Sequence, residues 1–381
     1  MKKIFLSILA FSLLIPIVNA EGDSLNLSSE SAILMDAESG KILYEKNIDA
    51  KLPMASMTKI MSMLLIMESI EDGTLTYEDK VLISENASGM GGSQVFLQAG
   101  EEYSVESLLK CIAIASANDA VVAMAEKISG SIEAFVDLMN ERAQELGLKN
   151  THFTNPHGLD NEDHYSTAYD MALMAQELLR HEDILKYTSI YEDYLTKPDG
   201  SQIWLVNTNR LVRFYDGVDG LKTGYTTEAG YCLTATAKKN DLRLISVVMK
   251  SPSPETRSSD TSTLLSYGFN SFKSNIIYSK DQSLGNIKVE KGKIKEVEVY
   301  LKEDATEILS VTQKPSEYSF NIKVDKIEAP VKAGSIVGTA EIIDSDGNIL
   351  DEVDIIVKED IERAGFLDYL KQSFRFITSG I

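Results

Sequence analysis

The sequence predicts an α+β domain followed by a small all-β domain, and three observations support this division. The first part of the chain combines helical apolar periodicity with two hairpin patterns. Composition changes near Ser283, after which apolar and polar residues alternate up to Lys358, with turns about every ten positions. The length of 381 residues is sufficient for two domains. We therefore expect a first domain over residues 21–280 and an all-β domain over residues 283–358.

The first domain is expected to begin with a hairpin and to carry most of the helices. Residues 32–36 and 41–45 are apolar-rich and flank the turn Glu38-Ser39-Gly40. Pro53 precedes an apolar run, which predicts a buried helix starting near Ser56 and ending near residue 67. Further helices are expected over residues 104–115, 120–128, 132–146, 166–179 (capped by Ser166 or Thr167) and 263–272, with a second hairpin over residues 231–237 and 242–249.

The second domain is expected to contain only strands, and no chemistry is evident in it. Candidate strands are residues 287–289, 296–301, 307–311, 319–324, 336–343 and 349–357. This pattern is typical of a spacer or interaction module.

The last segment, residues 361–381, is predicted to form an amphipathic helix. Its apolar face holds Phe366, Leu367, Leu370, Phe374 and Ile377, and its polar face holds Asp368, Lys371, Gln372 and Arg375. Charge interrupts the segment, so it is not expected to span a bilayer. It can lie in a membrane interface or pack on the all-β domain, and its terminal position favours the membrane.

Residues 1–20 have the pattern of a secretory signal peptide. Lys2 and Lys3 precede an apolar run over residues 4–18, and small residues allow cleavage after Ala20. A retained membrane helix is the alternative, although the run is short for one. The sequence therefore predicts an exported protein.

Charge and composition exclude several classes of partner. The net charge of −21 argues against binding to nucleic acid. The four histidines have no spacing typical of zinc ligands, so we expect no metal, and no cofactor motif is present. Cys111 and Cys232 lie in apolar runs and are interpreted as core residues, with a disulfide as the alternative.

Ser56 and Lys59 form the first candidate catalytic pair. On a helix, residues three apart lie one above the other, which would place the Lys59 amine beside the Ser56 hydroxyl. If burial and nearby positive charge keep Lys59 neutral, the amine can accept the serine proton. A capping serine beside a solvated lysine is the alternative. The same spacing recurs at Ser107 and Lys110, so spacing alone does not distinguish a catalytic pair from a capping serine and a solvated lysine.

Two further motifs follow in the chain, Ser116-x-Asn118 and Lys222-Thr223-Gly224. In this order the three motifs are typical of penicillin-binding proteins and class A β-lactamases. The chain resembles the D-alanyl-D-alanine carboxypeptidases of the low-molecular-mass penicillin-binding protein group, which are serine peptidases of the SxxK type. The resemblance implies a β-lactamase/transpeptidase-like domain, in which an antiparallel five-stranded sheet joins the N-terminal hairpin to the strands after Lys222.

The resemblance also implies roles for individual residues. Ser56 would form an acyl-enzyme, Lys59 would be the general base and Ser116 would relay a proton to the leaving nitrogen. Lys222 would lower the pKa of Lys59 and attract the terminal carboxylate of the substrate. The implied substrate-binding residues are Asn118, Lys222, Thr223, Gly224, Tyr225 and Arg257.

Backbone groups complete the implied site. The N–H groups of Ser56 and Tyr225 would form the oxyanion hole, and Gly224 would let substrate lie against an edge strand. Thr223 and Arg257 match positions that bind the carboxylate. For Arg257, a surface charge at a helix entry is an equally good interpretation.

The resemblance implies removal of the terminal D-alanine from peptidoglycan stem pentapeptides and covalent binding of β-lactam antibiotics. The expected location is the outer face of the bacterial cytoplasmic membrane or the cell wall, with the C-terminal helix as the membrane contact. One alternative is a β-lactamase of the same fold, although the Glu-x-x-Leu-Asn pattern of class A enzymes is absent. Another is a catalytically silent cell-wall scaffold, in which intact motifs would not be needed.

Overall fold

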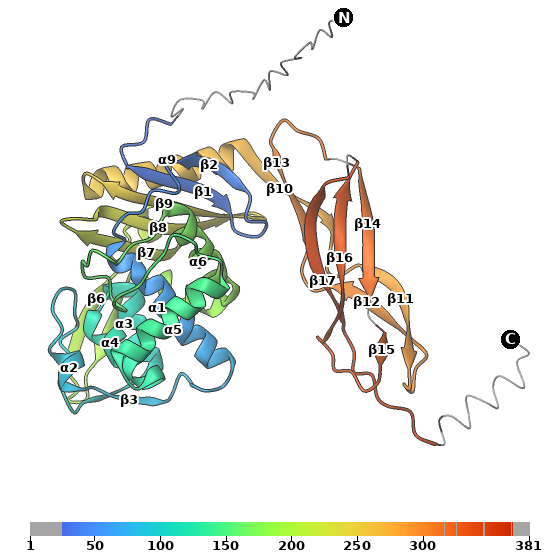
Figure 1. The fold of residues 1–381 in the computed structure, drawn as a ribbon, viewed down its shortest axis with the longest axis horizontal. Coiled ribbons are helices and arrows are strands. Elements are labelled where there is room, and N and C mark those ends of the chain that lie inside the picture. Colours follow the sequence, from blue (N-terminus) through green and yellow to red (C-terminus); the bar gives the residue numbers. More distant parts are fainter. Residues whose placement is uncertain (1–24, 316, 325, 346, 367, 369–381) are drawn as a thin grey trace, which may run out of the picture.

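The computed structural model describes residues 25–315, 317–324, 326–345, 347–366 and 368. The predicted signal peptide, residues 1–20, lies outside the described residues. Figure 1 shows a larger α+β unit and a smaller unit of strands, which α9 and β10 connect.

A five-stranded antiparallel sheet forms the centre of the first unit. Its order is β2 (Ile42–Lys46), β1 (Ser31–Asp36), β9 (Leu242–Ser251), β8 (Gly230–Lys239) and β7 (Val218–Thr226). The predicted pairing of the N-terminal hairpin with the strands after Lys222 is therefore confirmed. β7 is an edge strand, so one side of its backbone has no neighbouring strand within this sheet.

Helices cover both faces of the sheet (Figure 1). The long helix α9 (Pro254–Ser271) packs on one face, against β8 and β9. The other face carries a lobe of α1 (Lys59–Glu71), α3 (Val105–Ala115), α4 (Asn118–Ser129), α5 (Ile132–Glu145) and α6 (Ala168–Arg180). Every residue of α1 from Lys59 to Met67 is buried, which is typical of a helix at the centre of a lobe.

Shorter elements complete the first unit. They are η1 (Ala55–Thr58), α2 (Glu85–Ser88), η2 (Glu182–Ile184), α7 (Leu185–Thr188), α8 (Leu211–Phe214) and the pairs β3 (Lys80–Leu82) with β4 (Glu102–Ser104) and β5 (Glu192–Thr196) with β6 (Gln202–Val206). The hairpin of β5 and β6 was not predicted from the sequence.

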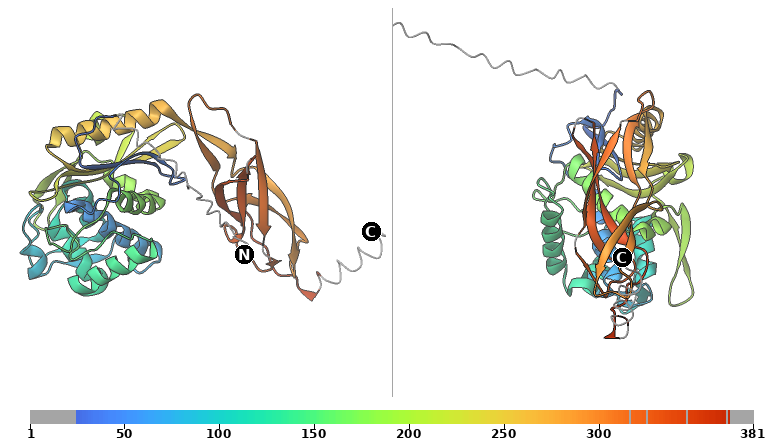
Figure 2. Two further views of the ribbon diagram at one scale, coloured as in Figure 1. Left: turned by 45° about the horizontal axis from the view of Figure 1, so that its top comes forward. Right: turned by 90° about the vertical axis from the view of Figure 1, so that its right-hand side faces the viewer.

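The second unit has its own core and contains all six predicted strands. A six-stranded sheet has the order β14 (Tyr318–Val324), β16 (Ile336–Asp344), β17 (Ile349–Val357), β12 (Glu296–Leu301), β11 (Ser283–Glu290) and β15 (Ile327–Glu328). β10 (Phe272–Tyr278) pairs with β13 (Ala305–Ser310) and was not predicted. Because α9 runs directly into β10, this unit begins where the helix ends (Figure 2).

Two predictions about helix boundaries need correction. α9 begins at Pro254 rather than near Thr263, because Ser253 and Thr256 form a reciprocal capping box and Pro254 suits the first helical position. The start of the predicted terminal helix is extended, since Ile361 forms a β-bridge with Val331. Most of that segment lies outside the described residues. Within the described part of the chain, no helix is long and apolar enough to cross a membrane.

Candidate active site

Ser56 lies in η1, just before α1, where the backbone is strained. Ala55 immediately before it has φ +48°, a left-handed conformation that residues with a Cβ adopt rarely. The Thr58 hydroxyl donates to the Ala55 carbonyl oxygen at 2.8 Å and closes this turn. The turn therefore fixes the direction of the Ser56 side chain before α1 begins.

The Lys59 amine is held at three points. Its Nζ contacts Ser56 Oγ at 3.0 Å and donates to Asn118 Oδ1 at 2.7 Å and to the backbone oxygen of His157 at 2.7 Å, which leaves the lone pair of the neutral amine for the serine hydroxyl. The side chain is fully buried. The structure thus brings Ser56 and Lys59 together as the helical spacing predicts.

Burial and charge both act on Lys59. Burial lowers the pKa of its amine well below the usual value, and the charge of Lys222 lowers it further, while Asp119 opposes the shift. Burial, followed by the charge of Arg257, also lowers the pKa of Lys222 to about 7. The arrangement favours a neutral amine beside the serine hydroxyl.

The second Ser-x-x-Lys pair has a different environment. Lys110 forms an ion pair with Asp193 at 2.7 Å and donates to the backbone oxygen of Tyr194. Ser107 exchanges a hydrogen bond with Ser104 at the start of α3. In this pair the serine is therefore bonded to Ser104, the N-cap of α3, and the lysine is in a partly exposed ion pair, which distinguishes the pair from Ser56 and Lys59.

Asn118 connects the lysine to a glycine-rich loop. Its Nδ2 donates to the backbone oxygen of Gly91 at 2.7 Å, and its backbone N–H donates to Ser93. A Cβ on Gly92 would lie 2.8 Å from Nδ2, so the loop can approach this closely only with glycine there. Asn118 is consequently fixed on both sides.

Ser116 lies at the left-handed C-cap of α3, with φ +61°, and is buried. This conformation turns the chain sharply from α3 into α4, so that Ser116 and Asn118 come from one tight connection. In the part of the chain that the structure describes, its hydroxyl makes no hydrogen bond to Lys59 or Lys222.

The loop that contains His157 and Gly158 was predicted only as a turn. Gly158 has φ +92°, and a Cβ there would lie 1.9 Å from the Ala55 backbone oxygen. The loop is thus packed directly against the residue before Ser56. Burial first, then the charge of Lys59, lowers the pKa of the His157 ring to about 3, which keeps the ring neutral.

β7 supplies Lys222, Thr223, Gly224 and Tyr225. Lys222 is buried and faces the helical lobe, as does Gly224, where a Cβ would lie 2.7 Å from the Met54 backbone oxygen. Thr223 Oγ1 donates to Thr208 Oγ1 at 2.7 Å. The exposed Tyr225 ring stacks on Tyr231 with 4.3 Å between centroids.

Arg257 lies in the first turn of α9 and is only 8% exposed, so the interpretation as a surface charge is wrong. Its Nε is buried and has no hydrogen-bond partner among the described residues. A cation at a helix N-terminus is also unfavourably placed relative to the helix dipole. An arginine in this environment is suited to receive an anion.

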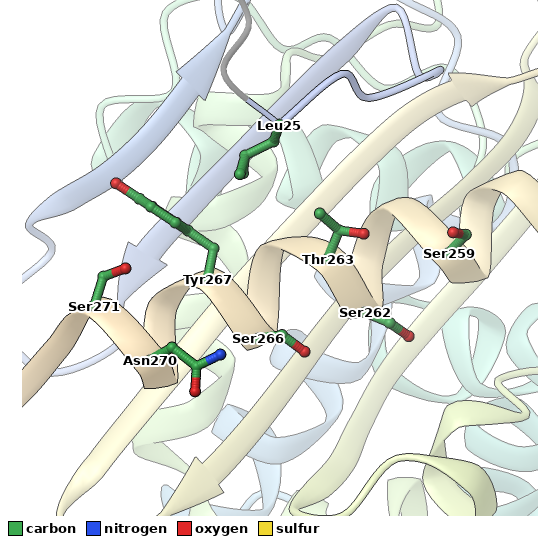
Figure 3. Close-up of a pocket in the computed structure, with 8 residues that line it drawn as sticks. All are labelled: Leu25, Ser259, Ser262, Thr263, Ser266, Tyr267, Asn270 and Ser271. Atoms are coloured by element: carbon green, nitrogen blue, oxygen red, sulfur yellow. The ribbon is translucent and has the colours of Figure 1, made fainter.

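Two other features of the first unit do not belong to the candidate active site. A surface hollow lined by Leu25 and polar side chains of α9 contains none of the predicted site residues (Figure 3). Cys111 and Cys232 are buried and free, consistent with their interpretation as core residues.

Comparison with known proteins assigns both units. Residues 18–253 match the D-alanyl-D-alanine carboxypeptidase family, and residues 272–363 match the C-terminal domain of penicillin-binding protein 5. D-alanyl-D-alanine carboxypeptidase DacF of Bacillus subtilis is 49% identical over 346 residues, covering 91% of this chain and 89% of the relative. DacC of Escherichia coli is 36% identical and covers 90% and 86%, respectively.

Solved structures give the same assignment. Penicillin-binding protein 5 from Haemophilus influenzae has a TM-score of 0.69 at 32% identity, covering 88% of this chain and 98% of that chain. Penicillin-binding protein D2 from Listeria monocytogenes, solved in an ampicillin-bound form, has a TM-score of 0.58 at 33% identity, with coverages of 64% and 99%.

The fold and the relatives define a serine peptidase of the penicillin-binding type. The chain belongs to the D-alanyl-D-alanine carboxypeptidase family. Membership supports the carboxypeptidase interpretation over the β-lactamase and scaffold alternatives.

Proposed function

We propose that Ser56 removes the terminal D-alanine from peptidoglycan stem pentapeptides through an acyl-enzyme. The observation that carries the proposal is the contact of 3.0 Å between Lys59 Nζ and Ser56 Oγ, with the amine buried and its pKa lowered. A neutral amine at this distance can accept the serine proton as the oxygen attacks.

Acylation follows from these positions. Ser56 Oγ bonds to the carbonyl carbon of the penultimate D-alanine, and its proton passes to Lys59. The C–N bond then breaks, and Ser116 relays a proton to the departing amine of the terminal D-alanine. Asn118 keeps Lys59 in place through its Oδ1 and contacts the substrate backbone.

The terminal carboxylate is proposed to bind at Lys222, Thr223 and Arg257. The free, buried Nε of Arg257 supports this role, because a guanidinium binds carboxylates through paired N–H groups. Since a bound carboxylate stabilises charged Lys222, substrate binding keeps this lysine cationic and Lys59 neutral. The edge of β7 beside Gly224 is proposed to bind the substrate backbone. The glycine itself lets the strand pack against the turn that holds Ser56, because a Cβ there would lie 2.7 Å from the Met54 backbone oxygen.

The backbone N–H groups of Ser56 and Tyr225 are proposed to bind the developing oxyanion. Loss of one such donor typically costs on the order of 10²–10³ in rate. Water then hydrolyses the acyl-enzyme and releases the shortened stem. A β-lactam would acylate Ser56 by the same attack, with the lactam C–N bond breaking, but its leaving amine stays tethered to the acyl group.

The substitutions Ser56→Ala and Lys59→Ala test the proposed function. Each should abolish release of D-alanine from a synthetic pentapeptide, because one removes the nucleophile and the other its base. Thermal unfolding would verify that the fold is retained. Lys110→Ala, at the second Ser-x-x-Lys pair, is the matched control and should keep full activity. Release of D-alanine by either variant of the proposed pair would refute the assignment.

We also propose that the protein is exported and held at the outer face of the cytoplasmic membrane. The signal-peptide pattern of residues 1–20 and the amphipathic pattern of residues 361–381 support this location. Truncation after Lys358 should release the protein from the membrane fraction without loss of activity. Unchanged partition of the truncated protein would contradict the proposal.

A further inference from the structure

Opposite charges lie at the two ends of the C-terminal half of β7. Positive charge comes from Lys222, the middle residue of the strand, and from Arg257, whose charge acts on Lys222. At the last residue of the strand, Thr226 Oγ1 donates to Asp160 Oδ1 at 2.7 Å. The substrate strand would therefore lie between a cationic and an anionic end.

The loop around Asp160 is fixed relative to Ser56. Asn155 Oδ1 accepts the backbone N–H of Gly158 at 2.6 Å, and Asn155 Nδ2 donates to the backbone oxygen of Leu159 at 2.9 Å. Gly158 packs against the Ala55 backbone oxygen, directly before the nucleophile. Asp160 is thus tied to the nucleophile turn through Gly158 and to the end of β7 through Thr226.

The charge of Asp160 is not neutralised by the fold. The residue is exposed, and Thr226 occupies one of its carboxylate oxygens. Among the residues that the structure describes, no lysine, arginine or histidine forms an ion pair with it. A carboxylate with a fixed position and no cationic partner is suited to bind a cation of the substrate.

The register of the substrate follows from the direction of β7. With its C-terminal carboxylate at Lys222 and Thr223, an extended peptide would add to the edge antiparallel to the strand. From Thr223 to Thr226 is a distance on the order of 10 Å, at about 3.3 Å per residue. The third residue of a pentapeptide lies two residues before its C-terminus, and its side chain spans the remaining few ångströms.

We propose that Asp160 selects stem peptides whose third residue carries a free amine on its side chain. The inference rests on the proposed function, because it takes the carboxylate position from there. Asp160 acts on binding and positions the upstream part of the peptide, whereas Ser56 and Lys59 carry out the bond cleavage. The recognised chemistry is a primary ammonium group, as in lysine or another diamino acid.

Two synthetic pentapeptides provide the test. Both have the stem sequence with lysine at the third position, and in one of them the side-chain amine is acetylated. The wild-type enzyme should release D-alanine from the free-amine peptide with a kcat/KM about two- to fivefold higher, the range of an exposed ion pair. The preference should weaken as salt is raised, because exposed charges are screened.

Asp160→Asn removes the charge but keeps an oxygen that accepts the Thr226 hydrogen bond. This variant should lose the preference, with kcat/KM for the acetylated peptide unchanged. A purely structural role would instead leave the preference intact, or would lower activity on both peptides equally. Glu162→Gln, at an exposed acid two positions further along the loop, is the matched control and should keep the preference.

Equal kcat/KM for the two peptides with the wild-type enzyme would overturn the inference while leaving the proposed function intact. A preference that persists in Asp160→Asn would overturn it as well. If the wild-type enzyme releases D-alanine from neither peptide, the proposed function fails, and the inference fails with it.

Discussion

Replacing Asn118 with aspartate would place a negative charge beside the proposed base. Asn118 Oδ1 accepts from Lys59 Nζ at 2.7 Å, and aspartate is nearly isosteric with asparagine. The carboxylate would favour the protonated amine and so raise the pKa of Lys59. Since only the neutral amine can accept the serine proton, we expect acylation to slow at every pH where Lys59 becomes protonated.

The distance sets the size of this effect. Two unit charges about 4 Å apart attract by roughly 4 kcal/mol at an effective dielectric constant of about 20, and each 1.4 kcal/mol is about tenfold. Opposite charges at such distances in proteins change protonation equilibria by about ten- to a thousandfold. On the acid side of the pH–rate profile, the acylation rate should decrease by a factor within this range. The decrease should disappear as the pH is raised.

The assay is the rate of covalent labelling by a fluorescent penicillin, followed across pH. Asn118→Ala is the control, because it also loses the hydrogen bond from Nδ2 to the Gly91 backbone oxygen but adds no charge. In Asn118→Ala, the labelling rate should fall, but the acid limb of the pH–rate profile should not move to higher pH. An acid limb that stays at the wild-type position in Asn118→Asp would refute a neutral Lys59 as the base.

Two further substitutions test the charges and packing around the site. Arg257→Gln removes a positive charge that, after burial, holds the pKa of Lys222 at about 7. Activity needs cationic Lys222 and is lost as pH rises through its pKa. The substitution should raise this pKa, so the alkaline limb of the pH–rate profile should move to higher pH. An unmoved limb would contradict a role for charged Lys222. Gly158→Ala combines backbone strain of about 1–3 kcal/mol with overlap on Ala55 that costs about 1–3 kcal/mol more. Gly73→Ala is the control, because φ is +80° there but the space is open, so only the backbone strain applies. If denaturant unfolding shows that both variants lose the same free energy of unfolding, the packing argument is refuted.

The order of elements could be predicted because its signals are local. Hairpins, apolar runs and caps depend on neighbouring residues. Thr167, one of the two predicted candidates, caps α6 by accepting from the Asp170 N–H. The hairpin of β5 and β6 was missed because only one residue in each strand, Leu195 and Leu205, is buried. Such strands lack the alternation of apolar and polar residues that marks a half-buried strand.

The residues of the candidate site could be found because their motifs keep a fixed order. The structure brings Ser56, Lys59 and Asn118 into one hydrogen-bonded group, although Asn118 is distant in the chain. The catalytic roles assigned to these residues remain predictions.

Two parts of the site had no usable sequence signal. The His157 contact uses a backbone oxygen, which any residue could supply. The burial of Arg257 depends on where α9 begins, and the capping box of Ser253 and Thr256 was the signal that could have placed it.

Mass spectrometry after exposure to penicillin would show whether Ser56 is the nucleophile and Lys59 its base. We expect one adduct per chain, mapped to the peptide that contains Ser56 and absent when Lys59 is replaced. An adduct on a different serine, or labelling at an undiminished rate without Lys59, would contradict these roles.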